Sequence, residues 1–137
     1  MATKKTISNT YTYAVGRRKS AIATVKLFSG KGESTVNKMA ADKYFPGKTA
    51  QIAYNRPFVI TETFGKYYFQ TKIIGGGFAG QVEALGLALA RALVKINESF
   101  KPILKPSGLL TVDSRVRERR MVGTGGKSRR QKQSPKR

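Results

Sequence analysis

The sequence predicts an α+β domain followed by an extended basic tail. Alternating apolar and polar residues predict strands near the start of the chain and again in its middle. A long apolar segment after a glycine triplet predicts a helix, while the last stretch has too few hydrophobic residues to fold alone. We therefore expect a flexible leader over 1–9, a globular domain with helices on one face of a sheet over 10–112, and a tail over 113–137.

The first strands are predicted from the Tyr-, Thr-, Val- and Ile-rich segment 10–28. Residues 16–20 interrupt the alternation and are expected to form a turn that places Arg17, Arg18 and Lys19 at one bend. A second turn over 29–32 leads to a short strand over 33–36.

Two short helices are expected next. Asn37 is a favourable N-cap residue and predicts a helix that runs to about Phe45. A second helix over 49–54 is expected to stop before Pro57, because the residue preceding a proline disfavours helical angles.

Aromatic and β-branched residues then predict a hairpin of strands 58–64 and 66–74 around Gly65. The longest helix is predicted over 78–98, and a further short helix over 100–105. The long helix has an apolar stripe and a stripe of small residues, and the small stripe predicts close packing on the sheet. The apolar stripe is Val82, Leu85, Leu89, Leu93 and Ile96, and the small stripe is Gly80, Ala84 and Ala88.

Charge is the strongest indication of function. The chain has 27 basic and 7 acidic residues, a formal net charge of +20, and ten of the basic residues lie with a single acid in 115–137. Like charges at this density repel one another unless a polyanion neutralises them, and nucleic acid phosphates release counterions when lysine and arginine bind. Because the excess extends over residues 1–114 as well, we expect nucleic acid to surround both parts of the chain.

Composition also argues against several kinds of site. The chain has no histidine and no cysteine, so neither an imidazole base nor a thiolate, zinc site or disulfide is available. The carboxylates are scattered, and no apolar run approaches the roughly 18 residues of a membrane span. The N-terminal residues lack the pattern of a signal peptide. We expect no enzyme activity, no cofactor, no metal and no membrane partner, and a cytoplasmic location.

Two turns are candidate phosphate sites. Arg17, Arg18 and Lys19 on a rigid hairpin could bind phosphate, although a charged hairpin tip can also simply be solvated. Gly75, Gly76 and Gly77 precede a helix whose free amides and dipole attract anions. The triplet lacks the Walker and dinucleotide-binding spacings. Three alternatives stay open for it: an RNA phosphate site, a purely structural bend, and a nucleotide site of an enzyme.

The tail supplies the remaining candidates. Its basic sequence, with almost no hydrophobic residues, predicts a segment that penetrates folded RNA and becomes ordered on contact. The expected ribosomal RNA contacts there are Arg115, Arg117, Arg119, Arg120, Lys127, Arg129, Arg130 and Lys132.

Three blocks of sequence resemble the small-subunit ribosomal protein nine family. They are residues 13–23, with the basic turn; 75–93, with the glycine triplet; and 109–119, with the Asp-Ser-Arg-Val-Arg-Glu-Arg run. The blocks occur in the family's order, and the similarity extends from about Thr10 to the last residue.

The resemblance implies a fold like the second domain of ribosomal protein five of the same subunit, including a left-handed strand–helix–strand crossover. It also implies a place in the head of the small subunit, on ribosomal RNA and beside neighbouring head proteins, without homo-oligomers. In the family the tail reaches the peptidyl-site transfer RNA, and Lys136 and Arg137 match the terminal pair that contacts it. Ser134 and Pro135 depart from the Phe-Ser that usually precedes this pair.

Two rival functions are compatible with parts of the sequence. A histone-like compactor would share the basic charge and would bind duplex DNA as well as RNA. A small nucleotide-dependent enzyme would use the glycine triplet, although the absence of histidine and cysteine argues against it.

Overall fold

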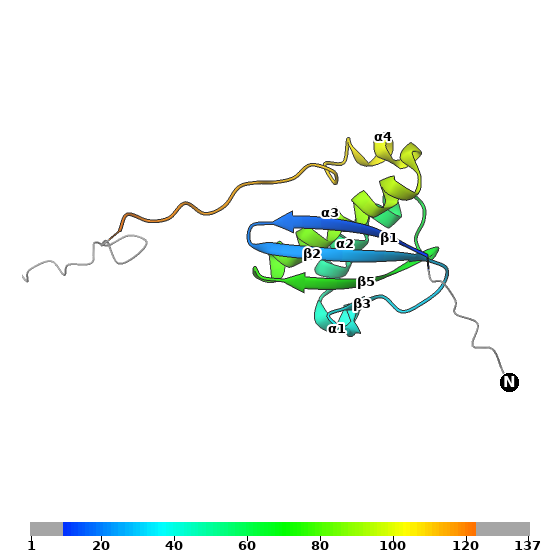
Figure 1. Cartoon of the computed structure of the whole chain (residues 1–137), viewed down its shortest axis with the longest axis horizontal. Coiled ribbons are helices and arrows are strands. Elements are labelled where there is room, and N and C mark those ends of the chain that lie inside the picture. Colours follow the sequence, from blue (N-terminus) through cyan, green and yellow to red (C-terminus); the bar gives the residue numbers. More distant parts are fainter. Residues whose placement is uncertain (1–9, 123–137) are drawn as a thin grey trace, which may run out of the picture.

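The structure is a computed structural model that describes residues 10–122. Figure 1 shows a sheet with helices behind it and a final segment that leads away from both. The secondary-structure elements are β1 (Tyr11–Arg18), β2 (Ala21–Ser29), β3 (Thr35–Val36), β4 (Met39–Ala40), α1 (Ala41–Tyr44), α2 (Lys48–Ile60), β5 (Tyr67–Ile74), α3 (Phe78–Ile96), the 3-10 helix η1 (Glu98–Phe100) and α4 (Lys101–Leu104).

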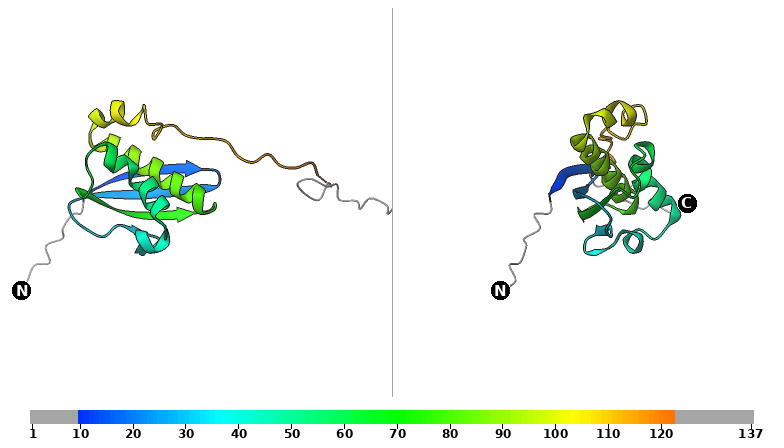
Figure 2. Two further views of the ribbon diagram at one scale, coloured as in Figure 1. Left: turned by 180° about the vertical axis from the view of Figure 1, so that it is seen from behind. Right: turned by 90° about the vertical axis from the view of Figure 1, so that its right-hand side faces the viewer.

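The sheet is mixed and has the strand order β1-β2-β5-β3-β4. β1, β2 and β5 pair antiparallel, β3 pairs parallel with β5, and β4 pairs antiparallel with β3. The views in Figure 2 place α2 and α3 on one face of the sheet, which confirms the predicted α+β class. The parallel β3–β5 connection runs through β4, α1 and α2; the left-handed crossover stays a prediction.

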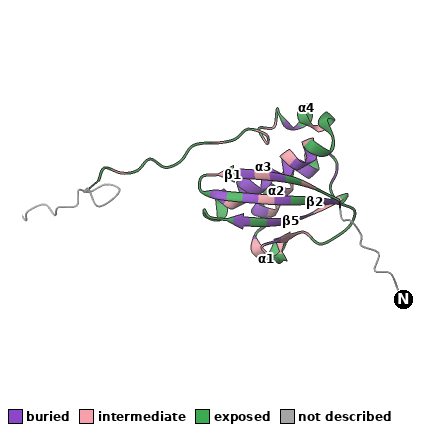
Figure 3. Cartoon of the chain, viewed as in Figure 1, coloured by how far each residue is buried: buried purple, intermediate pink, exposed green. Residues whose placement is uncertain are grey.

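The core lies between the sheet and α3. Buried and exposed residues alternate along β2 and β5, as Figure 3 shows, because successive side chains of a strand point to opposite faces. The predicted close packing of the small stripe is confirmed at Gly16 of β1. A Cβ added there would collide with the carbonyl oxygen of Ala84 and lie 2.6 Å from the amide nitrogen of Ala88.

The predicted helix capped by Asn37 is wrong. Asn37 and Lys38 form the turn between β3 and β4, and α1 starts only at Ala41, without a side-chain cap. The Asn37 side chain is used elsewhere: its Oδ1 accepts from the Ile73 amide at 2.9 Å and its Nδ2 donates to the Ile73 carbonyl at 3.1 Å. These two bonds anchor the turn to β5 beyond the last β3 pair.

The prediction that a helix stops before Pro57 is also wrong, and so is the hairpin around Gly65. α2 continues through Pro57 to Ile60, so the predicted strand 58–64 does not exist. Pro57 and Phe58 are buried, and their burial offsets the hydrogen bond that a proline removes from a helix. Thr61 is the C-cap of the helix, and its amide and hydroxyl both donate to the Pro57 carbonyl, at 3.1 Å and 2.9 Å.

α3 also covers the free edge of the sheet. The Arg91 guanidinium donates to the Val15 carbonyl at 2.8 Å, and the Lys95 ammonium donates to the Tyr13 carbonyl at 2.6 Å. Both carbonyls belong to β1, the first strand of the sheet. Two cations of α3 therefore occupy carbonyl acceptors along the edge of this strand.

Candidate nucleic-acid interface

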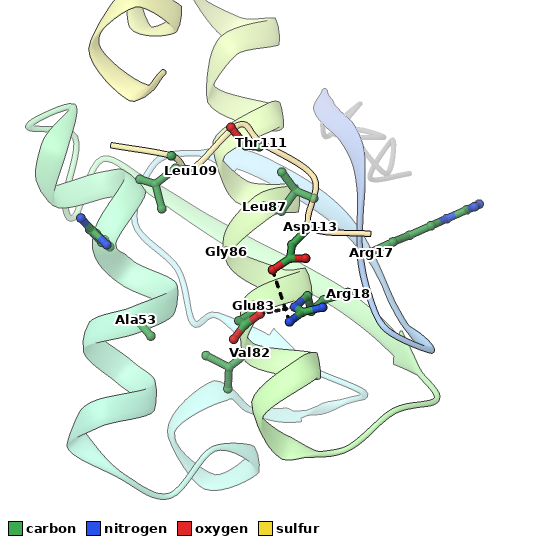
Figure 4. A pocket seen from close by; sticks show the side chains of 12 residues that line it. Arg17, Arg18, Ala53, Val82, Glu83, Gly86, Leu87, Leu109, Thr111 and Asp113 are labelled. Carbon is green, nitrogen blue, oxygen red and sulfur yellow. Dashed lines mark hydrogen bonds and ion pairs between the residues drawn. The ribbon is translucent and has the colours of Figure 1, made fainter. Parts of the chain in front are cut away.

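The predicted basic turn has a different geometry from the one expected. β1 extends through Arg18, so only Lys19 and Ser20 connect the two strands, and Lys19 adopts a left-handed φ of 53°. Because neighbouring residues of a strand point to opposite faces, Arg17 and Arg18 diverge. Figure 4 shows Arg17 pointing away from the domain while Arg18 points between α3 and the start of the tail.

Arg18 is held by internal contacts. Its Nε lies 2.6 Å from Glu83 Oε2, its second terminal nitrogen lies 3.3 Å from Asp113 Oδ2, and the other donates to the Arg115 carbonyl at 2.8 Å. The Arg18 side chain is 12% exposed. The sequence groups it with Arg17 and Lys19 as a phosphate clamp, whereas the structure joins β1, α3 and the tail through it.

Asp113 completes this cluster at the start of the tail. Its carboxylate accepts from the Arg115 amide at 3.1 Å and from the Arg115 guanidinium at 2.7 Å and 3.0 Å. These hydrogen bonds, with the neighbouring positive charges, hold the pKa of Asp113 well below its usual range. The same contacts raise the pKa of the Arg115 guanidinium.

We call Arg18, Glu83, Asp113 and Arg115 the tail-root cluster. Two positive and two negative charges meet in it, so it is formally neutral. The sequence did not predict the ion pairs of Arg18 with Glu83 and Asp113. The signal that could have indicated them is the scarcity of acids, because each of only seven carboxylates in so basic a chain is expected to lie beside a cation.

The tail-root cluster lies beside a cavity of about 320 Å³ between α2, α3 and the residues that lead into the tail (Figure 4). Besides Arg18, Glu83 and Asp113, its lining comprises Arg17, Ala53, Arg56, Val82, Gly86, Leu87, Gly108, Leu109 and Thr111. Figure 1 shows the tail leaving from here past the β1–β2 turn. The cluster therefore sets the direction in which the tail leaves the domain.

The structure explains why glycine is needed at two of the three positions of the triplet. Gly75 and Gly76 have left-handed φ angles of 73° and 70°. A Cβ at Gly75 would lie 2.6 Å from the Ser20 carbonyl oxygen, and one at Gly76 would lie 2.7 Å from the Ala21 Cβ. Gly77 is the N-cap of α3, and a Cβ there would meet nothing within 4 Å. The backbone of Gly77 is the open part of the triplet.

The described part of the tail presents its cations without secondary structure. Arg117 and Arg119 are exposed and Arg120 is partly exposed, and no helix or strand forms over 111–121. Arg115 is 85% exposed although Asp113 binds it. The remaining predicted contacts lie outside the described residues: Lys127, Arg129, Arg130, Lys132, Lys136 and Arg137.

Other kinds of site can be examined over the same range. Within residues 10–122, no group of three or more acidic side chains is placed to hold a metal ion. The helices of this range include none that is long and apolar enough to cross a membrane.

The sequence as a whole matches one known family, since the profile described as "Ribosomal protein S9/S16" matches residues 16–137. The chain belongs to this ribosomal protein family. The predicted membership is thereby confirmed, and it places the chain among ribosomal proteins of the small subunit, which function in translation.

Two relatives show how far the similarity extends. The "Small ribosomal subunit protein uS9" of Maridesulfovibrio salexigens is 42% identical over 120 residues, which cover 88% of this chain and 92% of that protein. The protein of the same name from Amoebophilus asiaticus is 44% identical over 110 residues, covering 80% of this chain and 86% of the relative. Both matches therefore cover at least four fifths of this chain and of the relative.

Proposed function

We propose that this chain is a structural, non-enzymatic component of the small ribosomal subunit that binds ribosomal RNA in the head of the subunit. Family membership is the observation that carries the proposal, because both relatives are named as small-subunit proteins. The net charge of +20 supports it, since a polyanion must neutralise this excess in the assembled particle. The chain works in the cytoplasm, without cofactor or homo-oligomer, beside other head proteins.

The domain (10–112) binds RNA through the side of the β1–β2 turn. Arg17 points away from the domain and Lys19 stands at the turn itself, so both are accessible to phosphates. The Gly75–Gly77 backbone leads into α3, and the open position at Gly77 allows an RNA phosphate to approach the first amides of the helix.

The tail (113–137) binds between RNA helices. Its root is fixed by the tail-root cluster, in which Arg18 and the Asp113-bound Arg115 act first as internal contacts. The exposed face of Arg115 and the side chains of Arg117, Arg119 and Arg120 then contact phosphates, followed by Lys127, Arg129, Arg130 and Lys132. Lys136 and Arg137 contact the peptidyl-site transfer RNA.

The salt dependence of RNA binding tests this proposal. If about ten phosphates are contacted, a log–log plot of the association constant with small-subunit ribosomal RNA against salt should have a slope of about −7 to −9. A slope near zero would contradict the proposal. Equal affinity for duplex DNA in a competition assay would favour a histone-like compactor, and ATP binding at millimolar concentration would favour a nucleotide-dependent enzyme.

A further inference from the structure

One face of the sheet carries no helix within residues 10–122, as Figures 1 and 2 show. Every second residue of β1, β2 and β5 points to this face. The strand registers bring these residues into rows across the sheet. Two adjacent rows are Tyr13–Lys26–Gln70 and Val15–Thr24–Lys72.

An open hollow of about 800 Å³ lies on this face, between β2, β5 and the β3–β4 turn. Lys26, Lys38 and Lys72 line it, and all three are exposed. No carboxylate lines the hollow in the part of the chain that the structure describes. The other lining residues carry hydroxyl or amide groups: Thr24, Thr35, Asn37, Gln70 and Thr71.

Three cations around one hollow, without an acid beside them, repel one another until an anion enters. Hydrogen-bonding groups for phosphate oxygens and ribose hydroxyls lie between them on Thr24, Thr35 and Gln70. The Asn37 amide already binds the Ile73 backbone, and the Thr71 hydroxyl is buried. Lys26 is partly positioned already, since its ammonium lies 4.9 Å from the centre of the Tyr11 ring. The charge and chemistry of the hollow are complementary to a nucleic acid backbone.

Lys38 gives an independent indication. The turn between β3 and β4 consists of Asn37 and Lys38, with left-handed φ angles of 48° and 68°. Two-residue turns with both angles positive favour Asn-Gly, because asparagine and glycine adopt these angles at little cost, whereas lysine adopts them only at a steric cost. A lysine in the place of the preferred glycine adds backbone strain but presents a cation at the rim of the hollow.

We propose that this hollow is a second RNA-binding surface, in which Lys26, Lys38 and Lys72 bind backbone phosphates of small-subunit ribosomal RNA. Tyr13, 48% exposed and in the same row as Lys26, stacks on an adjacent unpaired base. This inference rests on the proposed function for the identity of the RNA. It adds a surface on the opposite side of the sheet from α3, using none of the residues assigned above.

The test compares two charge-matched variants of the full chain for binding to small-subunit ribosomal RNA over a range of salt. The hollow variant is Lys26→Ala/Lys38→Gly/Lys72→Ala. The control removes three exposed lysines outside the hollow: Lys48→Ala/Lys101→Ala/Lys105→Ala. We expect the hollow variant to bind about tenfold more weakly or worse, with a log–log slope less steep by about 2 to 3. The control variant should lose less affinity, and its log–log slope should change less.

Two single substitutions separate binding from folding. Lys38→Gly should raise the melting temperature, because glycine adopts the φ of 68° without strain, and should still weaken RNA binding. Tyr13→Ala should weaken binding, whereas Tyr13→Phe, which keeps the stacking ring, should restore it.

The outcomes distinguish this inference from the proposed function. Equal losses of RNA affinity in the hollow variant and its control, or no loss in the hollow variant, would overturn the RNA site in the hollow. The proposed function would still stand in that case, as long as the wild-type protein binds the RNA. Wild-type protein that does not bind the RNA at all would remove the proposed function itself. A hollow variant that binds RNA normally but is lost from assembled subunits would assign this surface to a protein neighbour and overturn the inference.

Discussion

At the scale of single residues, Gly16 decides how closely β1 approaches α3. Gly16→Ala would place a methyl group against the carbonyl of Ala84 and the amide of Ala88, both of which are backbone and cannot rotate away. We expect the free energy of unfolding to fall by about 3 kcal/mol, as for an overpacked core. Chemical denaturation of the purified protein measures this loss.

Gly86→Ala in α3 is the matched control for Gly16→Ala. The nearest neighbour to its added Cβ is the Ala53 carbonyl oxygen at 3.8 Å, an ordinary van der Waals contact. Alanine also favours a helix interior over glycine by about 1 kcal/mol. Unchanged or increased stability is therefore expected, and equal destabilisation by both substitutions would contradict the close approach at Gly16.

Thr71 is a second residue with a predictable effect. Its hydroxyl oxygen is buried and has no hydrogen-bond partner among the residues that the structure describes. Thr71→Val removes this polar atom with little change of shape, so we expect stability to rise by about 1 to 2 kcal/mol. Thermal unfolding is the measurement.

Thr63→Val provides the contrast for Thr71→Val. Thr63 is equally buried, but its hydroxyl lies 2.7 Å from the Thr61 hydroxyl. Valine there would leave Thr61 with one partner fewer and should destabilise the protein. If both substitutions changed the stability in the same direction, the Thr71 hydroxyl would not be unpaired in the folded protein.

At the scale of elements, the tail-root cluster couples β1 and α3 to the start of the tail. Asp113→Asn removes the charge that holds both Arg18 and Arg115. We expect the amides around Arg115 to exchange hydrogen faster at neutral pH, while those of β2 stay protected. Glu118→Gln, at an exposed carboxylate farther along the tail, should leave this exchange unchanged.

The pH dependence of the cluster has a defined sign. The pKa of Asp113 is lowered in the folded chain, so its contribution is fully present above the ordinary carboxyl pKa of 3.8 and is lost as the pH falls through the lowered value. The tail root should therefore stay attached at pH 5 and above in exchange measurements. Release of the wild-type root between pH 5 and 7 would show that the carboxylate does not hold it.

Elements were predictable from sequence where local pattern and tertiary contacts agree. α3 has its glycines before it and two clear stripes within it, and β1 and β2 alternate regularly, so these elements follow from periodicity. α2 does not, because the burial of Pro57 and Phe58 outweighs the local preference to stop before a proline. The prediction that Asn37 caps a helix was wrong because of a tertiary contact as well. Its side-chain amide binds the backbone of β5 instead of the first amides of a helix.

The candidate site was predictable in composition but not in geometry. The basic residues near the β1–β2 turn can be read from the sequence. Their division between an outward Arg17 and an inward Arg18 depends on where β1 ends and on acids 65 and 95 positions away in sequence. Periodicity within a strand cannot supply such pairings. The lysines of the hollow were missed because β2, β5 and the β3–β4 turn are distant in sequence and meet only in the sheet.

At the scale of the whole molecule, several carboxylates serve internal contacts. Glu83 and Asp113 bind Arg18, and Asp42 accepts a hydrogen bond from the Tyr54 hydroxyl at 3.1 Å. Burial, together with this bond, raises the pKa of Tyr54 far above its usual value. Acids engaged in this way leave the outer surface dominated by positive charge, as expected of a protein that RNA surrounds.

The end of the tail gives a prediction at this scale. Lys136→Ala/Arg137→Ala removes two proposed transfer RNA contacts without touching the domain, so subunits should still incorporate the protein. We expect peptidyl-site transfer RNA to dissociate about fivefold faster from these subunits, with a weaker dependence on salt. Filter-binding of transfer RNA to purified subunits measures the rate.

Gln133→Ala/Ser134→Ala is the control, because it alters the same stretch and keeps both terminal charges. Its dissociation rate should match that of the wild type. Subunits that fail to assemble with either variant would instead assign the last residues to assembly.

The cations at the border of β1 have a consequence for the newly made protein. Before it joins the small subunit, a freshly synthesised copy is in solution, where another copy could extend the sheet by pairing with an open edge strand. Arg91 and Lys95 already bind two of the carbonyl acceptors that a second copy would need. Their positive charges also repel a second copy, which carries the same net positive charge. The opposite border ends in β4, only two residues long. Aggregation of unassembled molecules through either edge of the sheet is therefore disfavoured.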